Sequence, residues 1–381
     1  MIVVVYIIVV IILSNFWFWR DFMKISTKAL SLSENRTKHY NCIDLIKFIC
    51  ALFVVSIHVS PFASYNSFIN YGLKNYMARI AVPFFFVASG YFLFRKTSYE
   101  RFDKKIALTY VRRIFRIYVI WTIIYFPWVL KNSILVDEIG IRHGFLNWMK
   151  HFFLTGSFSH LWYLNATIIA TLILIFCISK KIRIKTIMCI ATVLYVVGLI
   201  PQTYSILLNP LCNIKVVWMF LDGLQRTIET TRNGLFFGFL FMGIGMVFAY
   251  KPIVMKYRTA VVGFGVSMML FLIEAFAVNE LGWARENDMY ICLVPVVFFL
   301  FYIVSHIEIK DNLIYTHLRK LGSLIFYLHL FIYYSMENIL SYIGINNSLI
   351  YYGIIVLITI IVSECIILLS TKFKWLKIVY S

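Results

Sequence analysis

The chain has 381 residues, of which 61% are apolar, 18% aromatic and only 14% charged. This composition excludes an ordinary soluble domain, and the apolar residues fall in runs of about twenty, which indicates a polytopic α-helical membrane protein. The formal net charge of +19 does not indicate nucleic-acid binding, because Lys and Arg stand in short clusters between the apolar runs. The seven cysteines show no metal-ligand spacing and lie mostly within the runs, so neither a disulfide framework nor a metal site is predicted.

The first apolar run covers residues 2–19, and two interpretations of it stay open. It lacks a basic n-region and a cleavage site, which argues against a removable signal peptide. Either it forms an additional transmembrane helix, or translation begins at Met23. We expect an optional N-terminal helix and basic cytoplasmic linker over 1–39, one membrane domain over 40–371, and a basic cytoplasmic tail over 372–381.

Ten further apolar runs predict an all-α bundle of about ten transmembrane helices. They cover residues 42–62, 77–94, 114–131, 159–178, 184–200, 234–250, 258–278, 288–305, 321–342 and 349–370. Of the 36 basic residues, 26 fall in the connections of one side and nine in those of the other. By the positive-inside rule, both ends of the ten-span body, including the C-terminus, face the cytoplasm, and the protein resides in the cytoplasmic membrane.

The run over 42–62 carries three ionisable residues on one stripe. Lys47 and His58 are eleven residues apart, which brings them within ~20° of each other around a helix, and Asp44 lies within ~40° of His58. Ionisable groups inside a membrane helix are costly unless they face protein or water, so they are functional candidates. The alternative is a Lys that reaches to the interface and a His that bridges two helices. The spacing alone leaves both open.

The predicted topology gives the other polar residues a depth in the membrane. Arg79, His160, Arg232 and Glu274 fall near the outer ends of their spans, whereas His329 lies about a third of the way up its own. Arg113 and Arg116 belong to the largest basic connection on the inner side.

Six local patterns, in order along the chain, carry a resemblance to a known family. They are NCIDLIKFICALFVVSIH from Asn41, ARIAVPFFFVASGYFLFRK from Ala78, Arg113-Ile-Phe-Arg116, His160-Leu-Trp-Tyr-Leu164, Arg232-Asn-Gly-Leu-Phe-Phe-Gly238 with Gly243, and Ser323-Leu-Ile-Phe-Tyr327-Leu-His329. Together they resemble the acyltransferase 3 family of integral membrane acyltransferases, over roughly residues 40–370. The chain departs from that family at Lys47, where the family has Arg. A lysine keeps the charge but loses the planar fork that binds phosphate or carboxylate through two bonds.

The resemblance implies an O-acyltransferase that moves an acyl group, acetyl or succinyl, from cytoplasmic acyl-CoA to a hydroxyl of an envelope or exported polysaccharide. The partners would be the bilayer, the saccharide on the outer side and acyl-CoA (acetyl-CoA first) as a co-substrate, with no permanently bound cofactor. His58 would act as base or nucleophile, since the pKa of an ordinary imidazole lies near 6.5.

The remaining roles combine the resemblance with the predicted depths, and Glu274 is included for its depth, which is similar to that of His58. Glu274 would orient the imidazole or hold a sugar hydroxyl, and Arg79 would stabilise the oxyanion or pair with Glu274. The expected acyl-donor residues are Lys47, Arg113 and Arg116, and the expected acceptor or path-lining residues are His160, Trp162, Arg232, Tyr327 and His329. Each has a structural alternative, such as a topology-setting Arg or an aromatic interface anchor.

Two other classes of function remain as alternatives. One is a transporter or flippase of a small anionic or lipid-linked solute, although the chain shows no internal symmetry of the kind that many transporters have. The other is an inactive relative that acts as a membrane partner, which the lysine at position 47 keeps open. The sequence has no P-loop, HExxH or G-x-S-x-G motif, so it gives no support to an ATPase, a metal hydrolase or a serine esterase.

Overall fold

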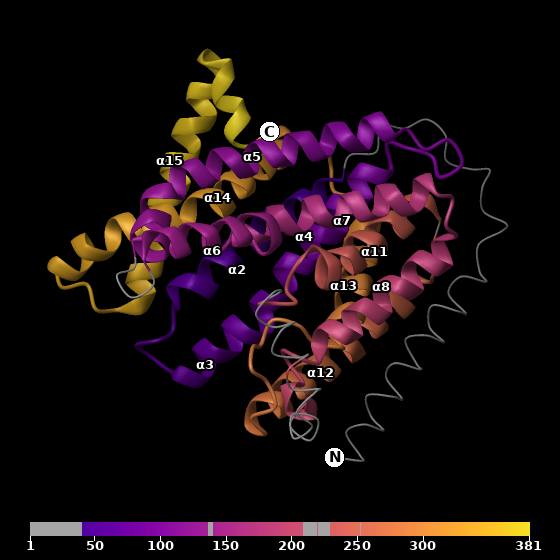
Figure 1. Ribbon diagram of the computed structural model, residues 1–381, viewed down its shortest axis with the longest axis horizontal. Helices are drawn as coiled ribbons and strands as arrows, with labels where there is room; N and C mark the ends of the chain where they lie inside the picture. The colour runs from indigo at the N-terminus through magenta and orange to yellow at the C-terminus, as the bar shows by residue number, and fades with distance from the viewer. Residues whose placement is uncertain (1–39, 136–139, 209–218, 220–228, 252) are drawn as a thin grey trace.

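The computed structural model describes residues 40–135, 140–208, 219, 229–251 and 253–381, and these residues form helices and connecting segments without a strand (Figure 1). The helices are α2 (Asn41–Val59), α3 (Ser67–Gly72), η1 (Leu73–Met77), η2 (Ala78–Ile80), α4 (Ala81–Phe94), α5 (Lys104–Val129), η3 (Leu130–Ile134), α6 (Ile141–Leu154), α7 (Trp162–Ser179), α8 (Ile184–Leu199), η4 (Ser205–Leu208), η5 (Gly234–Gly238), α11 (Phe239–Tyr250), α12 (Tyr257–Glu280), α13 (Leu293–His306), α14 (Leu313–Tyr342), α15 (Ser348–Lys372) and η6 (Lys374–Val379). The predicted run over 2–19 and its linker lie outside the described residues.

Each of the ten predicted runs overlaps a helix, which confirms the all-α fold class for the described residues. In the part of the chain that the structure describes, six helical segments are long and apolar enough to cross a bilayer: Asn41–Val59, Ser67–Phe94, Lys104–Ile134, Trp162–Ser179, Tyr257–Glu280 and Ser348–Lys372. Three others are apolar but shorter: Ile184–Leu199, Gly234–Tyr250 and Leu293–His306. The number of ten spans therefore stays a prediction.

Side-chain caps set where several of the long helices begin. The Asp103 carboxylate accepts the Lys105 N–H at 2.8 Å at the start of α5, and the Asn312 amide oxygen accepts the Ile314 N–H at 2.9 Å at the start of α14. Asn347 caps α15 in the same way. These caps satisfy N–H groups that have no partner inside the helix.

Small residues let two helix pairs approach backbone to backbone. A Cβ atom at Gly90 of α4 would lie 2.3 Å from the Met242 carbonyl oxygen of α11, and one at Gly245 of α11 would lie 2.1 Å from the Val87 oxygen. Such close packing is how helices associate in lipid, where burial of apolar surface supplies little net force. Gly322 of α14 similarly faces the backbone of Phe48 in α2, and a Cβ there would lie 3.1 Å from the Phe48 Cα. The α2–α14 contact is what positions the site.

The connections form two groups that match the charge alternation of the sequence. In one group, the Ser64 N–H donates to the Ser348 hydroxyl at 3.1 Å, and the Asn347 amide donates to the Tyr65 hydroxyl. In the other, the Asn41 amide donates to Asp311 at 2.9 Å, and the Tyr99 hydroxyl donates to the Ile182 carbonyl. Every pair joins two connections that the topology places on the same side.

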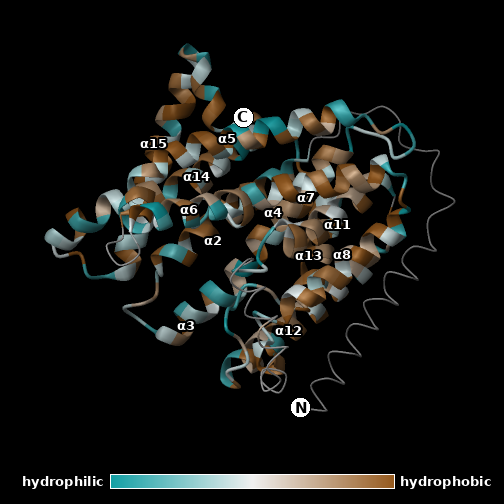
Figure 2. Cartoon of the chain, in the orientation of Figure 1, coloured by the Kyte–Doolittle hydropathy of each residue, from teal (hydrophilic) through white to brown (hydrophobic). Residues whose placement is uncertain are grey.

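Apolar side chains cover much of the outer surface of the bundle. Figure 2 shows hydrophobic residues along the helices and hydrophilic ones mainly at helix ends and connections. Helices α12 and α15 have few buried side chains, and apolar residues such as Ile273 and Leu357 are exposed on them. These faces are suited to contact with lipid acyl chains.

Candidate active site

Three imidazoles from separate elements meet inside the bundle. His58 stands in the last turn of α2, His329 in the middle of α14, and His160 in the turn before α7. The ring centroids of His58 and His329 are 5.3 Å apart, and those of His160 and His329 are 5.1 Å apart. His329 is fully buried, His160 is 2% exposed, and His58 is partly buried. His58 thus lies against the ring of His329 inside the bundle, as expected for an ionisable residue of an apolar helix.

The backbone of α14 fixes the tautomer of His329. Its Nδ1 lies 2.9 Å from the Phe326 carbonyl oxygen and 3.1 Å from that of Ile325. Because carbonyl oxygens only accept hydrogen bonds, Nδ1 carries the proton, and the neutral ring presents a bare Nε2. That Nε2 is buried and has no partner among the described residues. The cluster therefore holds a fixed, buried proton acceptor beside His58.

Tyr125 of α5 braces this part of α14. Its hydroxyl donates to the Tyr327 carbonyl at 2.7 Å and accepts the Phe331 N–H at 2.9 Å. These two backbone groups are the ones that pair with each other in a regular α-helix. The Tyr125 ring also contacts His160, with centroids 4.9 Å apart. The Tyr125 side chain thus contacts both the α14 turn that carries His329 and the ring of His160.

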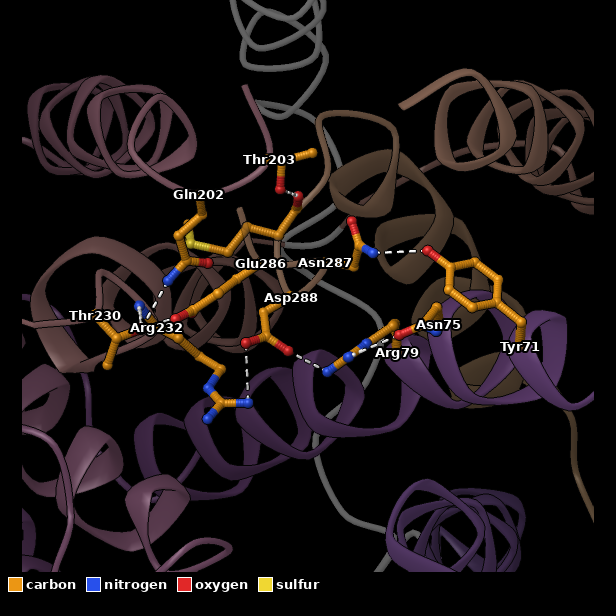
Figure 3. A network of polar contacts seen from close by, with 11 residues as sticks. Tyr71, Asn75, Arg79, Gln202, Thr203, Thr230, Arg232, Glu286, Asn287 and Asp288 are labelled. Carbon is orange, nitrogen blue, oxygen red and sulfur yellow. Dashed lines mark hydrogen bonds and ion pairs between the residues drawn. The ribbon is translucent and has the colours of Figure 1, made fainter. Parts of the chain in front are cut away.

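A largely buried carboxylate joins two arginines in a polar network (Figure 3). Asp288, in the connection between α12 and α13, pairs with Arg79 of η2 through one oxygen and with Arg232 through the other, the latter at 3.0 Å. The Arg79 guanidinium also donates to the Asn75 amide oxygen at 3.0 Å, and that of Arg232 lies 4.8 Å over the Trp162 ring. The positive charges of Arg79 and Arg232 act on the His58 imidazole.

The Asp288 carboxyl is ionised by its neighbours. Burial alone would raise its pKa, but the two guanidinium groups outweigh burial and hold the pKa of Asp288 below its ordinary value. Among Arg79, Asp288 and Arg232, one negative charge therefore faces two positive ones.

Neighbouring residues hold the two connections of the network together. The Gln202 side-chain amide lies beside Thr230. With the amide oriented so that its oxygen faces Thr230, this oxygen also accepts the backbone N–H of Arg232 at 3.1 Å. The Asn287 amide donates to the Tyr71 hydroxyl at 2.7 Å, and the Thr203 hydroxyl donates to the Met289 carbonyl. The backbone on both sides of Asp288 is thus tied to other elements (Figure 3).

Glu274 has a different neighbourhood from the one expected. Its carboxylate accepts the N–H groups of Ile291 and Cys292 at 2.7 and 2.8 Å, and the Tyr204 hydroxyl also donates to it. It therefore caps the N-terminus of α13, a position that suits a negative charge. The expected pairing of Arg79 with Glu274 is wrong, since Arg79 pairs with Asp288. A catalytic role for Glu274 stays a prediction.

A second charged cluster lies toward the other end of α2. Asp44 pairs with Arg319 of α14 at 3.4 Å, and the charges of Asp44, Arg319 and Arg113 act on Lys47. The Arg113 guanidinium lies 5.3 Å over the Tyr110 ring, and its charge also acts on Tyr327. The structure thus brings Lys47, Arg113 and Tyr327 into one region. Arg116 is exposed on α5.

Two residues of the site were not foreseen from the sequence. Asp288 is the first residue of the predicted run over 288–305 and was given no role, and only the fold brings it between two arginines from distant segments. Tyr125 was one of 25 tyrosines, and its sequence position carries no signal. Among the described residues, no group of three His, Cys, Asp or Glu side chains is arranged to hold a metal ion.

Three curated bacterial proteins are similar to most of this chain. Two from Enterococcus faecalis, each named an amino-acid racemase, are 29% and 26% identical over 345 and 346 residues. One from Enterococcus gallinarum, named a serine/alanine racemase, is 24% identical over 340 residues. The matches cover 88–89% of this chain but only 46–47% of each relative. The chain thus spans about half the length of these relatives. No solved structure matches the chain.

The family comparison covers the helices that carry the site. The sequence model described as an acyltransferase domain, that of the acyltransferase 3 family, matches residues 40–368. This range begins just before α2 and ends within α15, so it includes the histidine cluster, the Arg–Asp–Arg network and the charged cluster around Lys47. The chain therefore belongs to the acyltransferase 3 family of membrane acyltransferases.

Proposed function

We propose that the protein transfers an acyl group, acetyl or succinyl, from cytoplasmic acyl-CoA to a hydroxyl group of an envelope or exported polysaccharide. The observation that carries the proposal is the contact between the rings of His58 and His329, in which the tautomer of His329 is fixed. This contact lies between the basic cluster around Lys47 at one end of α2 and the arginine pair at the other. Acyl transfer to an alcohol needs a base beside the hydroxyl, and a buried imidazole meets that need at neutral pH.

In the proposed reaction, His58 removes the proton of the acceptor hydroxyl as the oxygen attacks the thioester carbonyl. The bare Nε2 of His329 accepts the second N–H of the charged His58 ring and stabilises it. The tetrahedral intermediate collapses, the C–S bond breaks, and the thiolate takes the proton to leave as free coenzyme A. Arg79 or Arg232 stabilises the oxyanion of the tetrahedral intermediate. A direct attack by His58 on the thioester is the alternative first step.

The proposal extends to the donor and the cell. Lys47, Arg113 and Arg319 provide positive charge for the phosphates of acyl-CoA on the cytoplasmic side. Trp162, His160 and Arg232 line the acceptor side, and Tyr327 and His329 line the path from the donor region. The domain over 40–371 resides in the cytoplasmic membrane with its C-terminus inside, and no cofactor is permanently bound.

The direct test replaces His58 by Ala and measures ester-linked acyl groups on surface polysaccharide by mass spectrometry. We expect a loss of at least about a hundredfold, at the low end of what general base catalysis supplies. His143→Ala is the matched control, because His143 is an exposed histidine of α6. Unchanged acylation by His58→Ala at normal protein levels would contradict the role of His58.

A second candidate function is the transport of a small solute. The relatives' names concern amino acids rather than saccharides, and a polar site inside a bundle can also serve a permeation path. Purified protein in liposomes would discriminate the two. Uptake of labelled serine or alanine without acyl-CoA favours transport, whereas acyl-CoA-dependent labelling of an added saccharide favours transfer.

A further inference from the structure

The Arg79–Asp288–Arg232 network has more hydrogen-bond donors than its own residues use. Arg79 donates to Asp288 and Asn75, and Arg232 donates to Asp288. The Nε–H groups of both arginines are buried and have no partner among the described residues. Leaving such donors unsatisfied is costly, so two of them at one place indicate a site that a further acceptor can fill.

The charges of the network also remain unbalanced. One carboxylate, 9% exposed, faces two guanidinium groups that are 17% and 30% exposed. The charge of Lys74 acts on His58 together with those of the two arginines, so the region beside the reacting imidazole is positive. A planar guanidinium pairs best with a carboxylate or phosphate through two parallel bonds.

The backbone at Asp288 is fixed by its neighbours, whereas its side chain is held, within the described part of the chain, only by the two arginines. The backbone around it is tied down through Asn287 and Met289, whereas its carboxylate pairs with only the two arginines among the described residues. A rotation about its own side-chain bonds would release both guanidinium groups without moving the connection. The Arg232 guanidinium meanwhile lies 4.8 Å over the Trp162 ring, a contact that does not involve Asp288.

From these contacts we infer that the arginine pair is a binding site for a carboxylate or phosphate of the acceptor, and that Asp288 occupies this site when no acceptor is bound. The acceptor is then an acidic saccharide, whose charged group binds Arg79 and Arg232. The inference rests on the proposed function, which it deepens by naming the charge of the acceptor. The inference also gives Asp288 a role, because its carboxylate competes with the charged group of the acceptor for the two arginines.

The test measures equilibrium binding of glucuronate and of glucose to the purified full chain in lipid nanodiscs, without acyl-CoA, by the fluorescence of the tryptophans. We expect glucuronate to bind at least about tenfold more tightly than glucose. Arg232→Gln and Arg79→Gln should each remove most of that preference, because a charge-assisted pair is lost. Arg285→Gln is the control, since Arg285 is an exposed arginine of the same connection.

The variant that decides the role of Asp288 is Asp288→Asn, which keeps the size of the side chain but removes its charge. We expect it to bind glucuronate several-fold more tightly than the natural chain, while a purely structural carboxylate would make binding weaker or unchanged. Size-exclusion profiles verify that each variant is folded.

Equal binding of glucuronate and glucose, including no binding of either, would overturn the inference, as would a weaker affinity of Asp288→Asn. These outcomes are separate from the failure of the proposed function. If the protein acylates a neutral saccharide and shows no preference for glucuronate, only the anion site is refuted. If it binds glucuronate but transfers no acyl group, only the proposed reaction is refuted.

Discussion

The hydroxyl of Tyr125 links helix α5 to the turn of α14 that positions His329. It occupies the place between the Tyr327 carbonyl and the Phe331 N–H of α14. In Tyr125→Phe these two groups pair with each other, and the turn that carries His329 closes. We expect acyl transfer to fall by about tenfold to a hundredfold, because an ångström of displacement is enough for such a loss. The measurement is the rate of acyl transfer to saccharide together with the thermal midpoint.

The control for this prediction is Tyr195→Phe. The Tyr195 hydroxyl is also buried and donates to a backbone carbonyl, that of Tyr290, at 2.7 Å. Its loss should cost stability of about 1 kcal/mol and leave transfer nearly unchanged. If both variants lose activity in proportion to stability, Tyr125 has no specific effect on His329.

Asp288 makes stability depend on pH at the acidic end. Its pKa in the folded protein is below its ordinary value because Arg79 and Arg232 outweigh the effect of burial. The stability that the ion pairs supply is therefore fully present above about pH 4, the ordinary pKa of Asp, and is lost as the pH falls through the lower folded value. The difference in thermal midpoint between the natural chain and Asp288→Asn should be constant from neutral pH to about pH 5 and shrink below about pH 4. A difference that already shrinks near pH 6 would refute this assignment.

The candidate site could be predicted in part at the level of residues. His58, Arg79, Arg232, His160 and His329 were named from motifs, and the structure brings the three histidines together and joins the two arginines through Asp288. The partner Asp288 could not be named, because it is far from both arginines in sequence. Glu274 and Asp288 are both acidic residues of the outer side, and only the fold decides which of them meets Arg79.

At the level of elements, the contact between α4 and α11 depends on two glycines. A Cβ at Gly90 would clash with the Met242 backbone, which cannot yield without moving the helix. We expect Gly90→Ala to lower the free energy of unfolding by about 1–3 kcal/mol or more and to reduce the yield of monodisperse protein. The thermal midpoint in detergent measures the effect. In the matched control, Gly353→Ala in α15, the Cβ would meet nothing within 4 Å, so stability should be unchanged or slightly higher.

Long apolar runs predicted the helices well, since a segment in lipid must satisfy its own backbone hydrogen bonds. They could not predict where amphipathic parts extend a helix. Helix α5 begins at Lys104 and α14 at Leu313, well before the apolar runs that were recognised. Helix α6 (Ile141–Leu154) was not predicted, because polar and apolar residues alternate in it and no membrane-length run marks it.

At the level of the whole molecule, the charge asymmetry and the contacts between connections agree. Basic residues concentrate in one group of connections, and hydrogen bonds such as Ser64 to Ser348 and Asn41 to Asp311 join only connections of the same group. These contacts come from packing, whereas the charge bias comes from membrane insertion, so the two observations are independent. Packing defines two faces, and the positive-inside rule predicts that the basic one is cytoplasmic.

Cysteine labelling in sealed right-side-out membrane vesicles tests which face is which. Cys212 is first replaced by Ser, because it lies in the predicted outer connection, outside the described residues. Ser98 lies exposed between α4 and α5, and Asn346 lies exposed between α14 and α15. We expect an impermeant maleimide to label Asn346→Cys in sealed vesicles and Ser98→Cys only after permeabilisation. The opposite pattern would invert the protein and place the Lys47 cluster outside, away from any acyl-CoA, so the proposed direction of transfer would fail with it.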